Sequence, residues 1–194
     1  TSTGFILNNT DDKINATNES YIYMAIRAPM MKEPEAGTEV FAIDTQDGTP
    51  LPSFKSTFPI DMQISKYTSV GVPETNARLT DKRTLETSST IAEGAKTSAS
   101  FAFMNGWGTG TGTDSTYYSW MFKRAKGFFD VVAYSGNSTV GRTVNHSLGA
   151  VPEMVIFKCR NAGEQWYTYH HGINGGVSPE DYAIYLNLTN TPSN

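Results

Sequence analysis

The sequence is poor in cysteine, in charged residues and in long hydrophobic runs, and each shortage excludes a class of protein. One cysteine, Cys159, excludes an internal disulfide and a cysteine-based metal site. We expect Cys159 to lie buried in a strand, as free cysteines commonly do. Charged residues make up 18% of the chain and the net charge is -4, which argues against nucleic acid as a partner. Because no apolar run approaches roughly 18 residues, no membrane span is expected.

Helical periodicity is also nearly absent, and short runs of β-branched and aromatic residues alternate with turn residues. This pattern predicts an all-β protein built as antiparallel β-sandwich modules, of the jelly-roll or concanavalin-like kind. The expected strands are 4–7, 21–27, 38–43, 56–64, 77–80, 83–87, 100–104, 117–123, 128–134, 141–146, 153–158, 164–169 and 182–186. Residues 67–76 and the glycine-rich stretch 106–113 are expected to be loops.

An internal repeat divides the chain unevenly. Residues 117–123 repeat the aromatic alternation of residues 21–27, 96 positions later. The repeat is out of frame, because the strand 21–27 ends a unit whose beginning is missing. We therefore expect an N-terminal strand segment that completes a neighbouring module, a central sandwich module and a C-terminal module that is incomplete alone. These three regions are residues 1–27, 28–126 and 127–194.

A sandwich that lacks a strand leaves backbone N–H and C=O groups unpaired beside an apolar groove, and a strand from elsewhere can complete it. Repeating that contact head to tail builds a filament of copies. The alternative is a longer polypeptide in which the next repeat is covalently attached. The predicted assembly strand contains Phe5, Leu7, Tyr21, Ile22, Tyr23, Met24 and Ile26. The predicted acceptor groove contains Phe129, Val131, Val155, Phe157 and Ile184.

Four segments carry a family resemblance. Residues 120–137 and 141–154, together with 21–27 and 37–41, resemble repeated modules of tail-fibre and other tail-associated structural proteins of bacteriophages, especially marine ones. The resemblance implies concanavalin-like β-sandwich modules in series. It also implies a structural or adhesive role outside the cell, in a virion tail or a cell-surface fibre. It supplies no catalytic residues.

The candidate chemical groups do not assemble into an active site. A hydrolase of this kind would need a pair of carboxylates in one groove. The carboxylates of this sequence are scattered, so we expect no enzyme activity. The neighbours His170 and His171 point to opposite faces of a strand and cannot chelate one metal together. We expect neither a metal nor another cofactor.

A glycan-binding adhesin module is the alternative function. Aromatic side chains can stack on sugar faces, and the candidate contacts are Trp107, Trp166 and Tyr167. For Trp107, in its glycine-rich loop, an exposed position and a buried one both stay open. For Trp166 the core is favoured over an exposed position. Sequons for N-glycosylation, which are used only in a secretory host, occur at Asn8, Asn15, Asn18, Asn137, Asn145 and Asn187.

Overall fold

The structure, a computed structural model, describes residues 16–18, 20 and 33–192. The chain divides into two compact units, Thr1–Met31 and Lys32–Asn194, and the second unit has no division at residues 126–127. The predicted strands 4–7 and 21–27 lie outside the described residues. The described residues form an all-β protein with antiparallel sheets, and they contain no α-helix, as the sequence pattern predicts.

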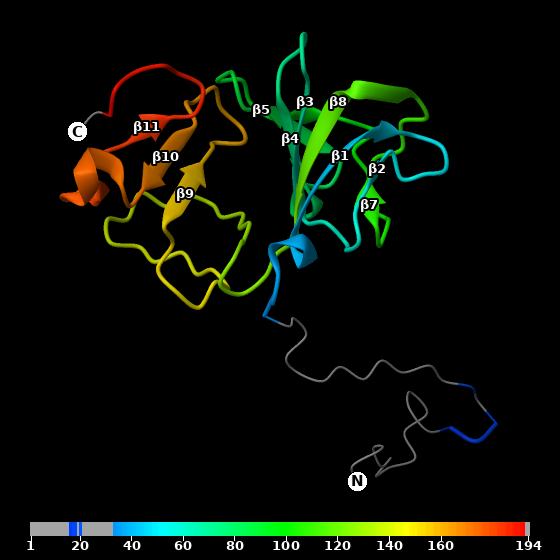
Figure 1. The fold of residues 1–194 in the computed structure, drawn as a ribbon. Coiled ribbons are helices and arrows are strands. Elements are labelled where there is room, and N and C mark those ends of the chain that lie inside the picture. The colour runs from blue at the N-terminus through cyan, green and yellow to red at the C-terminus, as the bar shows by residue number, and fades with distance from the viewer. Residues whose placement is uncertain (1–15, 19, 21–32, 193–194) are drawn as a thin grey trace. The chain divides into compact units, whose positions relative to one another are not determined.

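Three antiparallel sheets organise the second unit (Figure 1). The largest has six strands in the order β1-β8-β3-β4-β5-β6. Its strands are β1 (Phe41–Asp47), β3 (Met62–Tyr67), β4 (Glu74–Ala77), β5 (Arg83–Glu86), β6 (Gly94–Ala95) and β8 (Thr113–Phe122). A two-stranded sheet joins β2 (Phe54–Lys55) to β7 (Gly106–Trp107). A three-stranded sheet, in the order β11-β10-β9, contains β9 (Met154–Phe157), β10 (Tyr167–His170) and β11 (Ile184–Tyr185).

Short 3-10 turns connect the strands. They are η1 (Gly37–Glu39), η2 (Arg78–Thr80), η3 (Ile173–Gly176) and η4 (Pro179–Asp181). None of them is long enough to present an apolar face of its own, so the sheets supply the packing surfaces.

The core lies between the large sheet and the β2-β7 pair. Because side chains alternate along β8, Ser119 and Met121 point to the same face, and both are fully buried. Trp107 stacks on Phe54 with ring centroids 5.0 Å apart, and both rings belong to the buried cluster that contains Met121. The indole Nε1 of Trp107 donates to Ser119 Oγ at 2.9 Å. This face-to-face packing of antiparallel sheets around an apolar core fits the predicted β-sandwich.

The three-stranded sheet is fixed to the large sheet by polar contacts at the end of β5 and in the segment between β5 and β6. Trp166 is 5% exposed, and its Nε1 donates to the backbone oxygen of Glu86 at 2.8 Å. Arg160 binds Glu93 through two hydrogen bonds of 2.7 and 3.1 Å. Lys158 donates to the backbone oxygen of Thr90 at 3.2 Å, and burial lowers the pKa of Lys158.

Several expected elements differ from the observed ones. Residues 100–104, 128–134 and 141–146 contain no strand, and residues 77–80 turn into η2 after one strand residue. The expected loop 67–76 contains most of β4, and the expected loop 106–113 begins with the buried strand β7. Cys159 is half-buried after the end of β9 rather than buried in a strand, because the chain turns there and Sγ donates to Asn161 Oδ1.

Candidate strand-acceptor site

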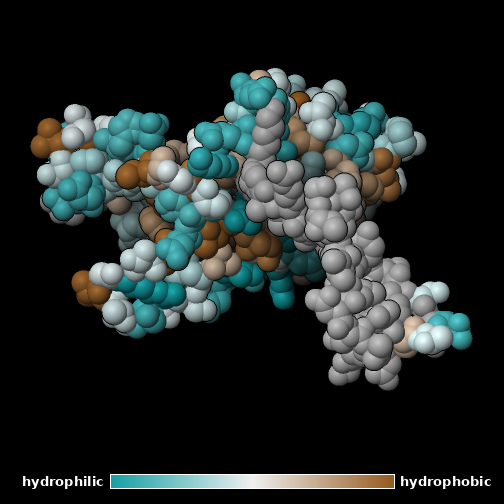
Figure 2. Space-filling model, turned by 90° about the horizontal axis from the view of Figure 1, so that it is seen from below, coloured by the Kyte–Doolittle hydropathy of each residue, from teal (hydrophilic) through white to brown (hydrophobic). Residues whose placement is uncertain are grey.

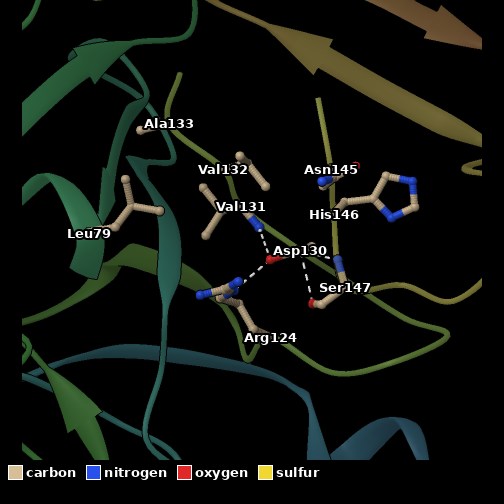
Figure 3. Close-up of a pocket in the computed structure, with 9 residues that line it drawn as sticks. All are labelled: Leu79, Arg124, Asp130, Val131, Val132, Ala133, Asn145, His146 and Ser147. Carbon is tan, nitrogen blue, oxygen red and sulfur yellow. Dashed lines mark hydrogen bonds and ion pairs between the residues drawn. The ribbon is translucent and has the colours of Figure 1, made fainter. Parts of the chain in front are cut away.

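Two extended segments that follow β8 form the candidate site. Residues 131–134 and 143–147 have strand-like sequences but pair with no strand among the described residues. Residues 131–133 and 145–147 of these segments line one open hollow of about 500 Å³, together with Leu79, Arg124 and Asp130. Figure 3 shows Val131, Val132 and Ala133 on one segment and Asn145, His146 and Ser147 on the other, with Asp130 between them. We call residues 131–134 and 143–147 the open pair.

The open pair is held at one end by the carboxylate of Asp130. Its side chain is 3% exposed, and Oδ1 accepts from Arg124 Nε at 2.5 Å. The backbone N–H of Val131 also donates to Oδ1, at 2.8 Å. Oδ2 accepts from the backbone N–H of Ser147 at 2.6 Å and from Ser147 Oγ at 2.8 Å. The Asp130 side chain therefore connects the two segments, whereas in a β-ladder backbone hydrogen bonds connect neighbouring strands.

These contacts set the protonation state of Asp130. Burial alone would raise the pKa of this carboxyl, but hydrogen bonds from Ser147 and Arg124 and the charge of Arg124 outweigh burial and lower it. The carboxylate is therefore ionised at neutral pH, and it accepts four hydrogen bonds in this form.

A second side chain holds the open pair nearer its turn. The guanidinium of Arg142 lies 5.7 Å from the ring centroid of Tyr134 and donates to the backbone oxygen of Ser135. The connecting turn contains Ser138 and Gly141, whose φ angles are both positive. Side chains thus bring the two segments near each other at both ends, while their backbones stay unjoined.

Backbone groups along the open pair have no hydrogen-bond partner among the described residues. This applies to the N–H and C=O groups of Val132, Ala133 and Tyr134 on the first segment and of Val144, Asn145 and His146 on the second. Water can satisfy such groups, because all six residues are exposed. They are equally free to pair with an added strand, which is the arrangement that an unpaired sheet edge offers.

The open pair also exposes apolar side chains to solvent. Val132, Tyr134 and Val144 are all exposed, as are Val140 in the turn and Val151 beyond it. Figure 2 shows hydrophobic residues in patches among hydrophilic ones on one face of the molecule. A β-prone segment with exposed apolar side chains and unpaired backbone is a surface that strand addition would cover.

The predicted acceptor groove is only partly brought together. Val131 lines the hollow, and Phe129 packs on Phe122 at the end of β8 with centroids 5.2 Å apart. Val155, Phe157 and Ile184 belong to the three-stranded sheet and do not line this hollow, so one groove that contains all five residues stays a prediction. The predicted assembly-strand residues, from Phe5 to Ile26, lie outside the described residues.

Two of the three predicted glycan contacts are buried. Trp107 is 3% exposed and belongs to the core, so its ring is not available to stack on a sugar. Trp166 is also buried, because it anchors the three-stranded sheet through its hydrogen bond to Glu86. Tyr167, its neighbour on β10, points to the opposite face and is 45% exposed.

The predicted sequons have different surroundings. Asn18 and Asn137 are exposed, and Asn8 and Asn15 lie outside the described residues. Asn145 lines the hollow of the open pair, so a glycan there would compete with an added strand. Asn187 is engaged on both sides: its Oδ1 accepts from the backbone N–H of Trp166, and its Nδ2 donates to Gln165 Oε1.

The described part of the chain brings no three histidine, cysteine, aspartate or glutamate side chains together as a metal site. The rings of His170 and His171 stack on each other, with centroids 4.6 Å apart. Among the described residues, no helix is long and apolar enough to cross a membrane.

The fold and the site define an antiparallel all-β domain that carries an open pair of extended segments. Residues 65–194 match a family of domains of unknown function, DUF7483, and the chain belongs to this family. The match contains the open pair, the three-stranded sheet and most of the large sheet, but not β1 and β2. No curated protein and no solved structure matches the chain.

Proposed function

We propose that this chain is a structural subunit of an extracellular fibre or a phage tail appendage, and that it assembles head to tail by β-strand addition. The observation that supports the proposal is the unpaired backbone of the open pair, in segments whose sequences are typical of strands. The acceptor residues are those of the open pair, with Val131 at the hollow. The donor strand is residues 21–27 of another copy.

The donor has the pattern that an added strand needs. In residues 21–27, Ile22, Met24 and Ile26 share one face, and no proline or glycine interrupts the run. Burying each of these three side chains contributes roughly 1.5–3 kcal/mol, in addition to the backbone hydrogen bonds. A donor at one end of the chain and an acceptor near the other give a heterologous contact, which extends without closing.

The resemblance to tail-fibre modules is in line with this role, and it is the reason for proposing an assembly outside the cell. In the alternative of tandem repeats, the donor strand reaches the acceptor from the same longer polypeptide. The contact is the same in both cases, and only the covalent connection differs.

Removal of the donor tests the proposal. A variant without residues 1–27 is expected to stay as soluble monomers that are prone to aggregation, while the full chain forms filaments by electron microscopy and large species by light scattering. A variant that assembles as well as the full chain would contradict the proposal.

A single substitution gives a sharper test in the full chain. Met24→Pro removes a backbone donor and disrupts the strand, so assembly should be lost. Thr17→Pro is the matched control, because Thr17 lies in a turn outside residues 21–27, and it should assemble normally. Equal loss in both variants would mean that the effect of Met24→Pro is not strand-specific.

A further inference from the structure

A row of aromatic side chains crosses the three-stranded sheet. Tyr167 on β10 is directly opposite Phe157 on β9 and Tyr185 on β11. Residues that face each other on antiparallel strands point to the same side of the sheet, so the three side chains share one face. The rings of Tyr167 and Tyr185 meet edge to face, with centroids 4.8 Å apart. We call Phe157, Tyr167 and Tyr185 the aromatic row.

The aromatic row faces away from the contacts that fix its sheet. Phe157 and Tyr167 are each 45% exposed, and Tyr185 is half-buried. Thr168 on β10 and Trp166, the residue before β10, point to the opposite side from Tyr167, and both are buried. Because Trp166 anchors that face to Glu86, the aromatic row is held on a supported sheet and not on a loop.

From this arrangement we infer that the aromatic row is a binding site for a neutral glycan. The exposed ring of Phe157 and the face of Tyr167 can stack on the C–H face of a sugar ring, and the tyrosine hydroxyls can hydrogen-bond its hydroxyl groups. This site is independent of strand addition, since none of its residues belongs to the open pair.

The hydroxyl of Tyr167 is protonated at neutral pH. The hydrogen bond to Tyr185 is the main cause that raises the pKa of the Tyr167 phenol, and the charge of Tyr185, burial and the carboxylate of Glu164 act in the same direction. Tyr167 therefore stays a neutral hydroxyl at neutral pH and can donate. The net charge of the chain, -4, also disfavours a carboxylated or sulfated glycan.

The size of the row argues against a second copy of the chain as the occupant. Aromatic side chains bury about 150–250 Å² each when fully covered, so three partly exposed rings offer roughly 200 Å². A stable protein interface needs about 800 Å² on each partner. A glycan of a few sugar units matches the smaller area.

The test is a glycan array that carries neutral, carboxylated and sulfated glycans, probed with the full chain and followed by calorimetry on the glycans bound. We expect neutral glycans to bind, and Tyr167→Ala to weaken that binding about tenfold through the loss of ring stacking. Phe157→Leu, which keeps an apolar side chain but removes the ring, should weaken binding without unfolding the sheet. Tyr134→Ala, at an exposed tyrosine of the open pair, should bind glycan as the wild type does.

Three outcomes would overturn the inference: no glycan bound at about 1 mM, preferential binding of acidic glycans, or unchanged affinity in both Tyr167→Ala and Phe157→Leu. A change of oligomeric state in Tyr167→Ala would instead identify the row as a protein interface. Filament formation by the same variants separates this inference from the proposed function. Assembly should persist in Tyr167→Ala, whatever the glycan result.

Discussion

The large sheet and the open pair are built from the same kind of sequence but reach different states. Residues 117–122 lie in the centre of a sheet, where β8 pairs with β1 on one side and β3 on the other. Residues 131–134 are also apolar and aromatic and include two β-branched valines, but they pair with no described strand. Local sequence therefore makes a segment competent to form a strand, but another segment must supply the pairing.

The closed region obtains that pairing from distant parts of the chain. Trp120 on β8 lies between Ile43 of β1 and Ile64 of β3, so three separate segments meet in one row. In the open pair, side chains of Asp130 and Arg142 replace backbone pairing at the two ends. The comparison predicts that damage to the closed region unfolds the domain, whereas damage to the open pair has local effects.

The largest effect is expected for Trp107→Ala in the closed region. The substitution removes a buried ring that stacks on Phe54, and it leaves Ser119 Oγ without its donor. Loss of a buried tryptophan costs about 3–5 kcal/mol, so we expect a large fall in the free energy of unfolding measured with denaturant. A change below about 1 kcal/mol would contradict the assignment of Trp107 to the core.

A smaller effect is expected for Asp130→Ala in the open pair. The substitution removes an acceptor for Ser147, Val131 and Arg124, at an expected cost of about 1–3 kcal/mol. Because Asp130 accepts from the backbone N–H groups of Val131 and Ser147, amide exchange should speed up at these two residues while β8 stays protected. Equal acceleration in both regions would mean that Asp130 stabilises the whole domain.

The same carboxylate predicts a dependence on pH. The folded state lowers the pKa of Asp130, so its ionised form stabilises the native state above the ordinary pKa of aspartate, about 3.9. This stability should be lost as the pH falls through the lower pKa of the folded state. The difference in stability between wild type and Asp130→Ala should therefore be constant near neutral pH and shrink in acid. A difference that grows in acid would have the wrong sign.

The smallest effect is expected for Arg142→Gln. Arg142 is exposed, and its contacts with Tyr134 and Ser135 lie at the surface. We expect a change within about 0.5 kcal/mol in the free energy of unfolding, since exposed contacts of this kind contribute little. A loss comparable to that of Asp130→Ala would show that both ends of the open pair are equally important.

Alternation and turn residues predicted the fold class and several strands. Residues 38–43, 117–123, 153–158 and 164–169 each overlap an observed strand, because their alternating side chains meet a partner. The glycine-rich stretch 106–113 was predicted to be a loop, but it begins with the buried strand β7. Its glycines allow close packing here and do not mark a flexible segment. At Gly106, where φ is +145°, a Cβ atom would collide with the backbone oxygen of Phe54.

The candidate site was only partly predictable. Val131 was found from its strand-like surroundings, whereas Asp130 was not, although a carboxylate within the apolar run 128–134 was a signal for a buried polar contact. The aromatic row was missed except for Tyr167, because its members come from three strands. Their meeting depends on register, which residue spacing alone did not reveal.

The most direct test of strand addition is hydrogen exchange at residues 132–134 and 144–146 in the full chain. At concentrations where the wild type assembles, these amides should be protected, and in Met24→Pro under the same conditions they should exchange freely. Protection of β8 should be the same in both proteins. Equally fast exchange in the assembled wild type and in Met24→Pro would contradict the proposal that the open pair accepts a strand.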